Sequence, residues 1–291
     1  MMNDNEFRTV SVDDCEIVGR GAHGIVYKIA PDTIVKVYRR NVPLKSIRQE
    51  KERSRRALVL GVPTAISFDI VRVGYSYGTV YELLDAEPME KYVNKSRENL
   101  DNFIEVSEKL LEEIHSIDAT EDLPDMKADH LKWNENIREW IGDDAANRIK
   151  RIIEEVPDSH KLLHGDFHMK NIILTKNGPM IIDMDTLCYG DGIFDLATIT
   201  NSYLIFPRID SVAATTVLGI SVEDARYIWE RTLDLYLKNT NEGDDSGIRN
   251  KCQILGIVRV LDYAKRGGIP DPDQRKVVCD KCLGFLETLL D

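Results

Sequence analysis

The stretch that decides the fold is His164-Gly-Asp-Phe-His-Met-Lys-Asn171, which is followed twelve residues later by the last residue of Ile181-Ile-Asp183. Apolar residues flank this polar segment on both sides: Leu162 and Leu163 before it, and Ile172, Ile173 and Leu174 after it. A polar segment between two short apolar runs of this kind predicts a loop that connects two strands.

Asp166, Asn171 and Asp183 form a set suited to magnesium-dependent phosphoryl transfer. That reaction needs one carboxylate to orient a hydroxyl and receive its proton. It also needs an amide oxygen and a second carboxylate to hold the metal against the nucleotide phosphates. The spacing matches H-x-D-x-x-x-x-N followed by an aspartate at the end of a short apolar strand. We therefore expect Asp166 to be the catalytic base, and Asn171 and Asp183 to bind Mg²⁺.

A second motif lies near the N-terminus, where Gly19, Gly21, Gly24 and Val26 fit G-x-G-x-x-G-x-V. Glycine triplets also open dinucleotide-binding units, but those units continue as a helix after the third glycine. Here residues 25–29 are rich in β-branched and aromatic side chains, so the glycines are expected to join two strands as a hairpin. Backbone without side chains can close over phosphates, which predicts a nucleotide site.

Lys36 follows in an alternating run that predicts a strand, and it is placed to contact the α- and β-phosphates. Such a lysine needs a carboxylate to hold it, and the helix expected from about residue 43 to residue 60 offers Glu50 and Glu52. Glu50 shares its helical stripe with apolar or small residues, whereas Glu52 lies on a more charged stripe. We therefore predict that Glu50 pairs with Lys36.

Together these motifs make the chain similar to the aminoglycoside phosphotransferase and choline kinase group, which has the protein-kinase-like fold. The resemblance covers about residues 16 to 200 and includes Tyr81-Glu-Leu-Leu-Asp85 and Gly190-Asp-Gly-Ile-Phe-Asp-Leu-Ala197. It implies a bilobal α+β architecture, with a small antiparallel sheet and one helix followed by a larger, mostly helical lobe. The expected division is residues 1–85 for nucleotide binding and residues 86–291 for catalysis and acceptor binding.

The resemblance also assigns supporting roles to residues outside the metal set. It implies that Glu82 and Leu84 line the nucleotide site in the segment between the lobes. It also implies that His164, His168 and Asp195 support the catalytic loop. The chain departs from many relatives at Met169-Lys170, where they have Pro-Gly, and at Met184, where they often have an aromatic residue.

Composition agrees with a globular protein rather than a membrane protein. The chain has 291 residues, of which 43% are hydrophobic and 30% are charged. No run of about 18 apolar residues occurs, and the polar, acidic start does not resemble a signal peptide. Five cysteines suggest reduced thiols and a cytoplasmic location. Cys279 and Cys282 lie in an apolar helical pattern, so core packing is expected rather than a zinc site.

Apolar residues at helical spacing predict several helices in the second part of the chain. The expected helices span residues 101–117, 131–141 and 145–156, and three more follow Asp195. The acidic segment between residues 118 and 129 is expected to be a loop. We interpret it as a solvated connection, with a role in acceptor specificity as the alternative.

Two other functions were weighed against a small-molecule kinase. A protein kinase carries a long activation segment and an A-P-E signature, but Asp183 and Asp195 are only twelve residues apart and no A-P-E follows. The presence of Lys36, Asp166, Asn171 and Asp183 together argues against a non-catalytic nucleotide-binding or sensor protein. The favoured reaction is transfer of the γ-phosphate of ATP or GTP to a hydroxyl.

Charge bears on the phosphate acceptor. Residues 1–85 carry 13 Lys and Arg against 11 Asp and Glu, so the whole net charge of −12 lies in the remainder of the chain. An acidic lobe favours a small cationic acceptor, such as an aminoglycoside, choline or an amino sugar, and disfavours nucleic acid. The alternative is that these acids lie on the surface and serve solubility. The basic run at residues 45–56 falls within one helix and is expected to be a solvent-exposed face. The sequence leaves the oligomeric state open.

Overall fold

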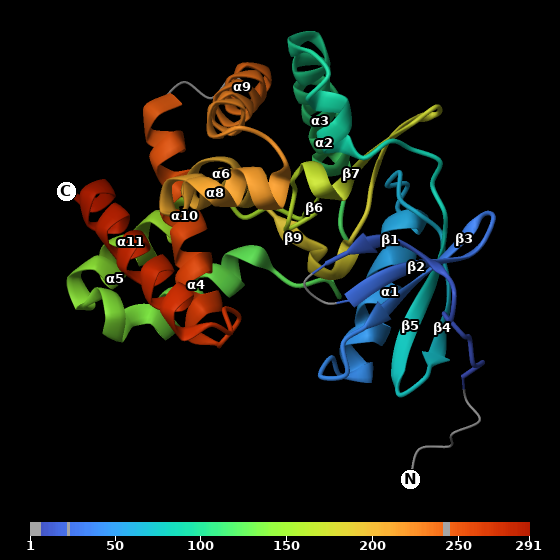
Figure 1. Ribbon diagram of the computed structural model, residues 1–291. Helices are drawn as coiled ribbons and strands as arrows, with labels where there is room; N and C mark the ends of the chain where they lie inside the picture. The colour runs from blue at the N-terminus through green and yellow to red at the C-terminus, as the bar shows by residue number, and fades with distance from the viewer. Residues whose placement is uncertain (1–6, 22–23, 241–244) are drawn as a thin grey trace. The chain divides into compact units, whose positions relative to one another are not determined.

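The computed structural model describes residues 7–21, 24–240 and 245–291 (Figure 1). Contacts divide the chain into two compact units. The first contains residues 1–88 and 171–186, and the second contains residues 89–170 and 187–291. The expected division was a single cut after residue 85. In the structure, the segment that follows the catalytic loop belongs to the first unit.

In the described part of the first unit, five strands form one antiparallel sheet in the order β1-β2-β3-β5-β4. Helix α1 covers one face of this sheet, and β7 and β8 form a separate hairpin (Figure 1). The elements are β1 (Glu16–Arg20), β2 (Gly24–Ala30), β3 (Thr33–Tyr38), α1 (Leu44–Val59), β4 (Ser67–Val73), β5 (Ser76–Glu82), β7 (Ile172–Thr175) and β8 (Gly178–Ile181).

Alternation of side chains along β3 places Val35 in the core of the first unit, with Val71, Val73 and Val80 from the neighbouring strands. Lys36 faces the other way, as the strand pattern predicts. Helix α1 begins after Pro43 and ends before Gly61, which has φ of +91°. Glycine adopts this left-handed conformation without the penalty that a side chain imposes, so the helix stops there.

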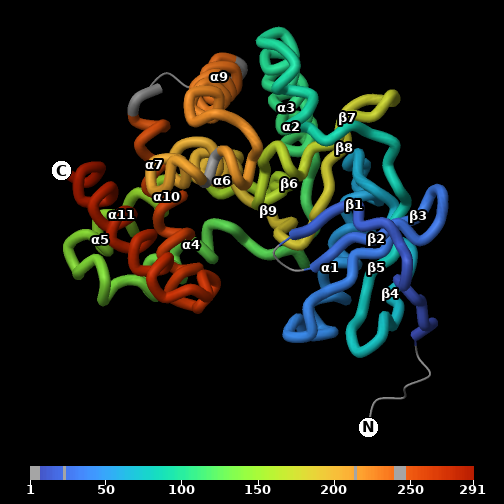
Figure 2. Tube along the Cα trace, in the orientation of Figure 1, coloured from blue at the N-terminus to red at the C-terminus, as the bar shows by residue number. Residues whose placement is uncertain are grey.

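The second unit is mostly helical. Its elements are α2 (Met89–Val93), α3 (Arg97–Ser116), α4 (Met126–Ile141), α5 (Asp143–Glu155), β6 (Lys161–Leu163), β9 (Cys188–Gly190), α6 (Ile193–Thr200), α7 (Phe206–Ile209), α8 (Ser211–Ala213), α9 (Val222–Thr240), α10 (Asp245–Lys265) and α11 (Pro272–Leu290). The strands β6 and β9 pair with each other. Helix α10 packs against α4, α6 and α11, and the trace of the chain is shown in Figure 2.

The α+β class and the expected helices are confirmed, with two differences. The loop expected to reach residue 129 ends earlier, because the side chain of Asp125 accepts hydrogen bonds from the N–H groups of Lys127 and Ala128 and starts α4. Between β9 and α9, the chain also forms helical turns that were not predicted, including π-helical turns at Asn201–Ile205 and Ala214–Leu218. Cys282 packs in the core, as expected.

Among the described residues, no helix is both long enough and apolar enough to cross a membrane.

Candidate functional site

The Lys36 ammonium is held by two carboxylates in the first unit. Its Nζ lies 2.8 Å from Glu50 Oε1 and 2.8 Å from Asp183 Oδ1. Burial alone would lower the pKa of Lys36, but the charges and hydrogen bonds of Asp183 and Glu50 raise it above its ordinary value. The lysine is therefore a fixed positive charge at any physiological pH.

The structure pairs Lys36 with Glu50, the acid that the helical stripe favoured. Glu50 is 6% exposed on the buried face of α1, and the Tyr81 hydroxyl also lies 3.4 Å from its Oε1. Glu52 is exposed and instead binds Arg55 and Arg56 on the same helix. The buried stripe of α1 thus aims one carboxylate at β3.

Asp183 and Asn171 are brought together by the hairpin of β7 and β8. The N–H of Ile182 donates to the carbonyl of Asn171 at 2.8 Å, so the hairpin pairing extends to the residue before Asp183. Asp183 itself has φ of +65°, a left-handed conformation that is costly for a residue with a side chain. Strain of this kind persists where the surrounding structure fixes it, and it concentrates at functional sites.

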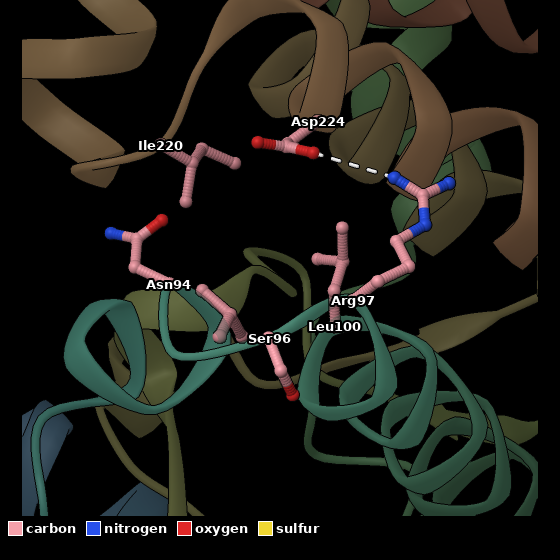
Figure 3. A pocket seen from close by; sticks show the side chains of 7 residues that line it. Asn94, Ser96, Arg97, Leu100, Ile220 and Asp224 are labelled. Atoms are coloured by element: carbon pink, nitrogen blue, oxygen red, sulfur yellow. Dashed lines mark ion pairs between the residues drawn. The ribbon is translucent and has the colours of Figure 1, made fainter.

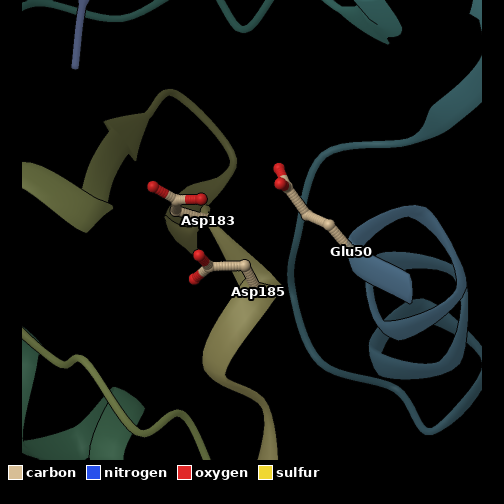
Figure 4. A group of neighbouring side chains, drawn as sticks. All are labelled: Glu50, Asp183 and Asp185. Atoms are coloured by element: carbon tan, nitrogen blue, oxygen red, sulfur yellow. The ribbon is translucent and has the colours of Figure 1, made fainter. Parts of the chain in front are cut away.

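The carboxylate of Asp185, which the sequence analysis did not single out, lies near those of Glu50 and Asp183. One carboxylate oxygen each from Glu50, Asp183 and Asp185 lies within 4.8 Å of the others (Figure 4). The guanidinium of Arg53 on α1 donates to the carbonyl of Asp185 and ties this turn to the helix. Glu50 is bound to Lys36, but the carboxylates of Asp183 and Asp185 offer oxygen ligands of the kind that Mg²⁺ prefers.

Asp195 organises the catalytic loop in the second unit. It is fully buried, and its Oδ2 and Oδ1 accept the N–H groups of His164 at 2.9 Å and Gly165 at 2.7 Å. Its Oδ2 also lies 3.1 Å from Nε2 of His115. Burial opposes the ionisation of Asp195, but the hydrogen bond and charge of His115 lower its pKa below the ordinary value. The loop is therefore anchored to an ionised carboxylate.

The two loop histidines make the same local contact. Nδ1 of His164 accepts the N–H of Asp166, and Nδ1 of His168 accepts the N–H of Lys170, both at 3.2 Å. Because Nδ1 accepts, Nε2 carries the proton in each neutral ring. Nε2 of His168 lies 3.4 Å from Asp166 Oδ2. Burial would raise the pKa of Asp166, but the hydrogen bond and charge of His168, with the charges of Arg259 and His164, together lower this pKa below its ordinary value.

Other side chains that fix the loop were missed by the sequence analysis. The N–H of Met169 donates to the Tyr203 hydroxyl at 2.7 Å, and the N–H of Phe167 donates to Thr198 Oγ1 at 3.3 Å. Arg259 on α10 donates to the carbonyl of Gly165. These residues lie far from the loop in sequence, and each fits an ordinary helical pattern, so only the tertiary structure shows their contacts.

The remaining predicted residues lie on the sheet of the first unit. Gly19 and Gly21 are at the end of β1 and Gly24 starts β2, so the predicted hairpin is present, although its tip at residues 22–23 lies outside the described residues. A side chain on Gly24 would meet the carbonyl oxygen of Val37, which explains the need for glycine there. Val26 lies on β2 opposite Lys36.

Glu82 ends β5, and Leu84 follows it. The Glu82 carboxylate accepts the N–H of Ile66 at 2.7 Å, so its side chain stabilises the sheet edge. The side chain that was expected to line the nucleotide site therefore has a structural contact of its own.

Known proteins were compared with the chain. A family model described as the phosphotransferase enzyme family matches residues 14–227. A search of curated protein sequences finds no match.

Solved structures with a similar fold include a choline/ethanolamine kinase family protein from Mesorhizobium loti. Its TM-score is 0.62 at 12% identity, and the match covers 95% of this chain and 88% of that protein. The ternary complex of streptomycin, ATP and APH(2'')-IIa has a TM-score of 0.59 at 16% identity, covering 94% of this chain and 92% of that one. The GDP complex of aminoglycoside 2'-phosphotransferase-IIIa has a TM-score of 0.60 at 11% identity, and the match covers 98% of this chain and 94% of that one.

These identities are low, so the solved structures establish the fold, and the family model establishes the kinship that the motifs predicted. With the fold, the motifs and the matched residues in agreement, the chain belongs to the phosphotransferase enzyme family.

Proposed function

We propose that the protein transfers the γ-phosphate of ATP or GTP to a hydroxyl of a small molecule, in a reaction that depends on Mg²⁺. The observation that carries this proposal is the position of Lys36, 2.8 Å from both Glu50 and Asp183. In protein kinases, phosphoryl transfer requires an ion pair between a strand lysine and a helix glutamate, and an aspartate that binds the metal; Lys36, Glu50 and Asp183 match these three parts.

Each site residue has a defined task in this proposal. Lys36 holds the α- and β-phosphates, and Glu50 keeps its ammonium in place. Asp166 orients the acceptor hydroxyl and takes its proton. His168 holds the Asp166 carboxylate, since its Nε2 lies close to Oδ2. Asp195 fixes the backbone of the loop that carries Asp166.

Asn171 and Asp183 would hold the metal, and the oxygen donors around Asp183 fit a hard cation. When bound, Mg²⁺ neutralises charge that develops on the transferred phosphoryl group. Asp183 can serve both partners, because Lys36 contacts its Oδ1 and the carboxylate has a second oxygen.

For the acceptor, we propose a small, cationic molecule. The net charge of residues 86–291 is −14, from 25 Lys and Arg against 39 Asp and Glu. Such a field raises the local concentration of cations. Streptomycin in one structural relative is consistent with this acceptor class. Relatives with ATP and with GDP bound leave the choice of donor nucleotide to experiment.

The direct test is a screen of the purified protein with ATP and with GTP. Aminoglycosides, choline, ethanolamine, sugars and homoserine serve as acceptors, with Mg²⁺ present or chelated. We expect transfer to at least one small cationic alcohol that stops on chelation. Phosphorylation of protein substrates alone would support the protein kinase alternative. Nucleotide binding without any transfer or hydrolysis would support the sensor alternative.

A further inference from the structure

A cavity of about 280 Å³ lies in the second unit, between the start of α3, the end of α2 and the start of α9. Figure 3 shows its lining side chains, which are Val93, Asn94, Ser96, Arg97, Leu100, Ile220 and Asp224. These residues have no part in the site described above. The lining combines apolar side chains with a cation and an anion, and Ile220 lies beside Asp224 while Leu100 lies beside Arg97 (Figure 3).

Arg97 lies over an aromatic ring and makes two long ion pairs, to Asp101 and Asp224, but no short hydrogen bond. Its guanidinium carbon lies 3.4 Å from the centre of the Tyr227 ring, and the Tyr227 hydroxyl is anchored to Asp101 Oδ1 at 2.7 Å. Asp101 and Asp224 lie 3.9 and 3.5 Å from the guanidinium, too far for strong hydrogen bonds. Across the described ranges, no group accepts a hydrogen bond from Arg97. An oriented, planar guanidinium with unused N–H groups is suited to a carboxylate.

The start of α3 adds to this preference for an anion. Ser96 is the N-cap residue, and its hydroxyl accepts the N–H of Asn99. The hydroxyl can still donate, and the positive end of the 20-residue helix faces the same place. A carboxylate at this point would therefore meet both Arg97 and the helix start.

The same cavity also has two side chains, Asp224 and Asn94, that could bind a cation. Asp224 is fixed by Ser221, which donates to its Oδ2 at 2.7 Å, and its other oxygen is the one that faces Arg97. Asn94 donates through its amide nitrogen to the carbonyl of Gly219, and its amide oxygen points toward the cavity (Figure 3). An ammonium group would find an acceptor in each of these side chains.

We propose that this cavity binds a small zwitterion, an α-amino acid or a related amino carboxylate with an apolar side chain. Its carboxylate would bind Arg97 at the start of α3, and its ammonium would bind Asp224 and Asn94. Val93, Leu100 and Ile220 would cover its side chain. The volume is at the lower end for ligand pockets, which restricts the site to small molecules.

Simpler ligands fit less well. Arg97 and Asp224 pair with each other at 3.5 Å, so an anion alone would compete with Asp224 for Arg97, and a cation alone would compete with Arg97 for Asp224. A neutral molecule would leave both charges without a new partner while it removed water from them. A ligand with adjacent opposite charges can give each side chain a closer partner than the 3.5 Å ion pair that joins them.

The cavity is separate from the catalytic base but close to its loop in the fold. Helix α2 links the two places, because Val93 lines the cavity and Glu90 binds Lys170 of the catalytic loop at 3.1 Å. Binding at the cavity requires neither nucleotide nor Asp166. The proposal can therefore be tested independently of the phosphotransfer reaction.

The test is equilibrium binding to the full chain without nucleotide, measured by titration calorimetry. The probes are leucine, its methyl ester, which keeps only the cation, and its N-acetyl form, which keeps only the anion. We expect leucine to bind at least about tenfold more tightly than either blocked form. Equal binding of all three probes, or no binding of leucine, would overturn the proposal.

Two variants and one matched control assign the binding to this cavity. We expect Arg97→Gln and Asp224→Asn each to weaken leucine binding by about tenfold or more, with circular dichroism unchanged. Arg226→Gln is the control, since Arg226 is exposed on the same helix as Asp224 and pairs with Glu230. Retained affinity in either cavity variant, or an equal loss in Arg226→Gln, contradicts the assignment.

Discussion

Asp195 Oδ1 accepts the backbone N–H of Gly165 at 2.7 Å, one residue before Asp166. The side chain is fully buried, and its other oxygen accepts the N–H of His164. This buried carboxylate therefore holds the two residues that precede Asp166 in the catalytic loop.

Replacing Asp195 with Asn should lower both stability and turnover. The amide NH₂ would face backbone N–H donors, and the variant should lose about 3 kcal/mol of unfolding free energy. Misplacement of Asp166 should lower kcat by about 10- to 100-fold. Urea denaturation and steady-state kinetics measure both effects. Asp158→Asn is the control, because Asp158 is exposed and pairs with Lys127; equal losses there would refute the anchoring role.

Glu50 and Glu52 lie two residues apart on α1 and allow a matched comparison. Glu50→Gln removes the charge that holds the Lys36 ammonium, so kcat/KM for the nucleotide should fall by about 10- to 100-fold. Glu52→Gln removes only exposed ion pairs with Arg55 and Arg56 and should change kcat/KM by less than about twofold. Similar kinetics in the two variants would show that the ion pair of Lys36 has no role in catalysis.

His168 should set the acidic limb of the pH–rate profile. It lowers the pKa of Asp166, and a carboxylate base is active only above its pKa. In His168→Asn this influence is lost, so the pKa of Asp166 rises and the acidic limb of kcat should move to higher pH. His160→Asn, at an exposed histidine outside the loop, should leave the limb in place. A shift of the same size in both variants would argue against the contact.

His130 should make the protein sensitive to acid. The ring is buried, and burial lowers its pKa from 6.5 to about 3. Because the folded pKa is depressed, the unfolded chain binds the extra proton, and stability falls as pH decreases from about 6.5 toward 3. At pH 5 this costs about 2 kcal/mol. Urea denaturation at pH 7 and pH 5 measures the free energy of unfolding. This free energy should fall less between the two pH values in His130→Gln than in the parent, and an equal fall would contradict the role of His130.

The sequence predicted the elements whose signals are local. The alternation around Lys36 predicted β3, the Gly-Val-Pro stop predicted the end of α1, and the stripe through Glu50 predicted its buried side. The pattern around Asp166, Asn171 and Asp183 predicted a polar loop between two apolar strands, and the structure has this loop between β6 and β7. In each case the signal lies in residues that are close together in the sequence.

Contacts made by distant segments could not be predicted in this way. His115 and Arg259 look like ordinary residues of amphipathic helices, yet they contact Asp195 and the carbonyl of Gly165. Asp185 was passed over because nothing in the sequence shows that its carboxylate lies near Glu50. The start of α4 was missed because Asp125, one of several acids in that segment, is the one that caps the helix.

The most direct test of the central claim is single-turnover transfer of the γ-phosphate with the Asp166→Asn variant, measured beside nucleotide affinity. Once an acceptor is known, the variant should bind nucleotide with unchanged affinity and transfer phosphate about 10²- to 10⁴-fold more slowly than the parent. A transfer rate close to that of the parent would contradict the role assigned to Asp166.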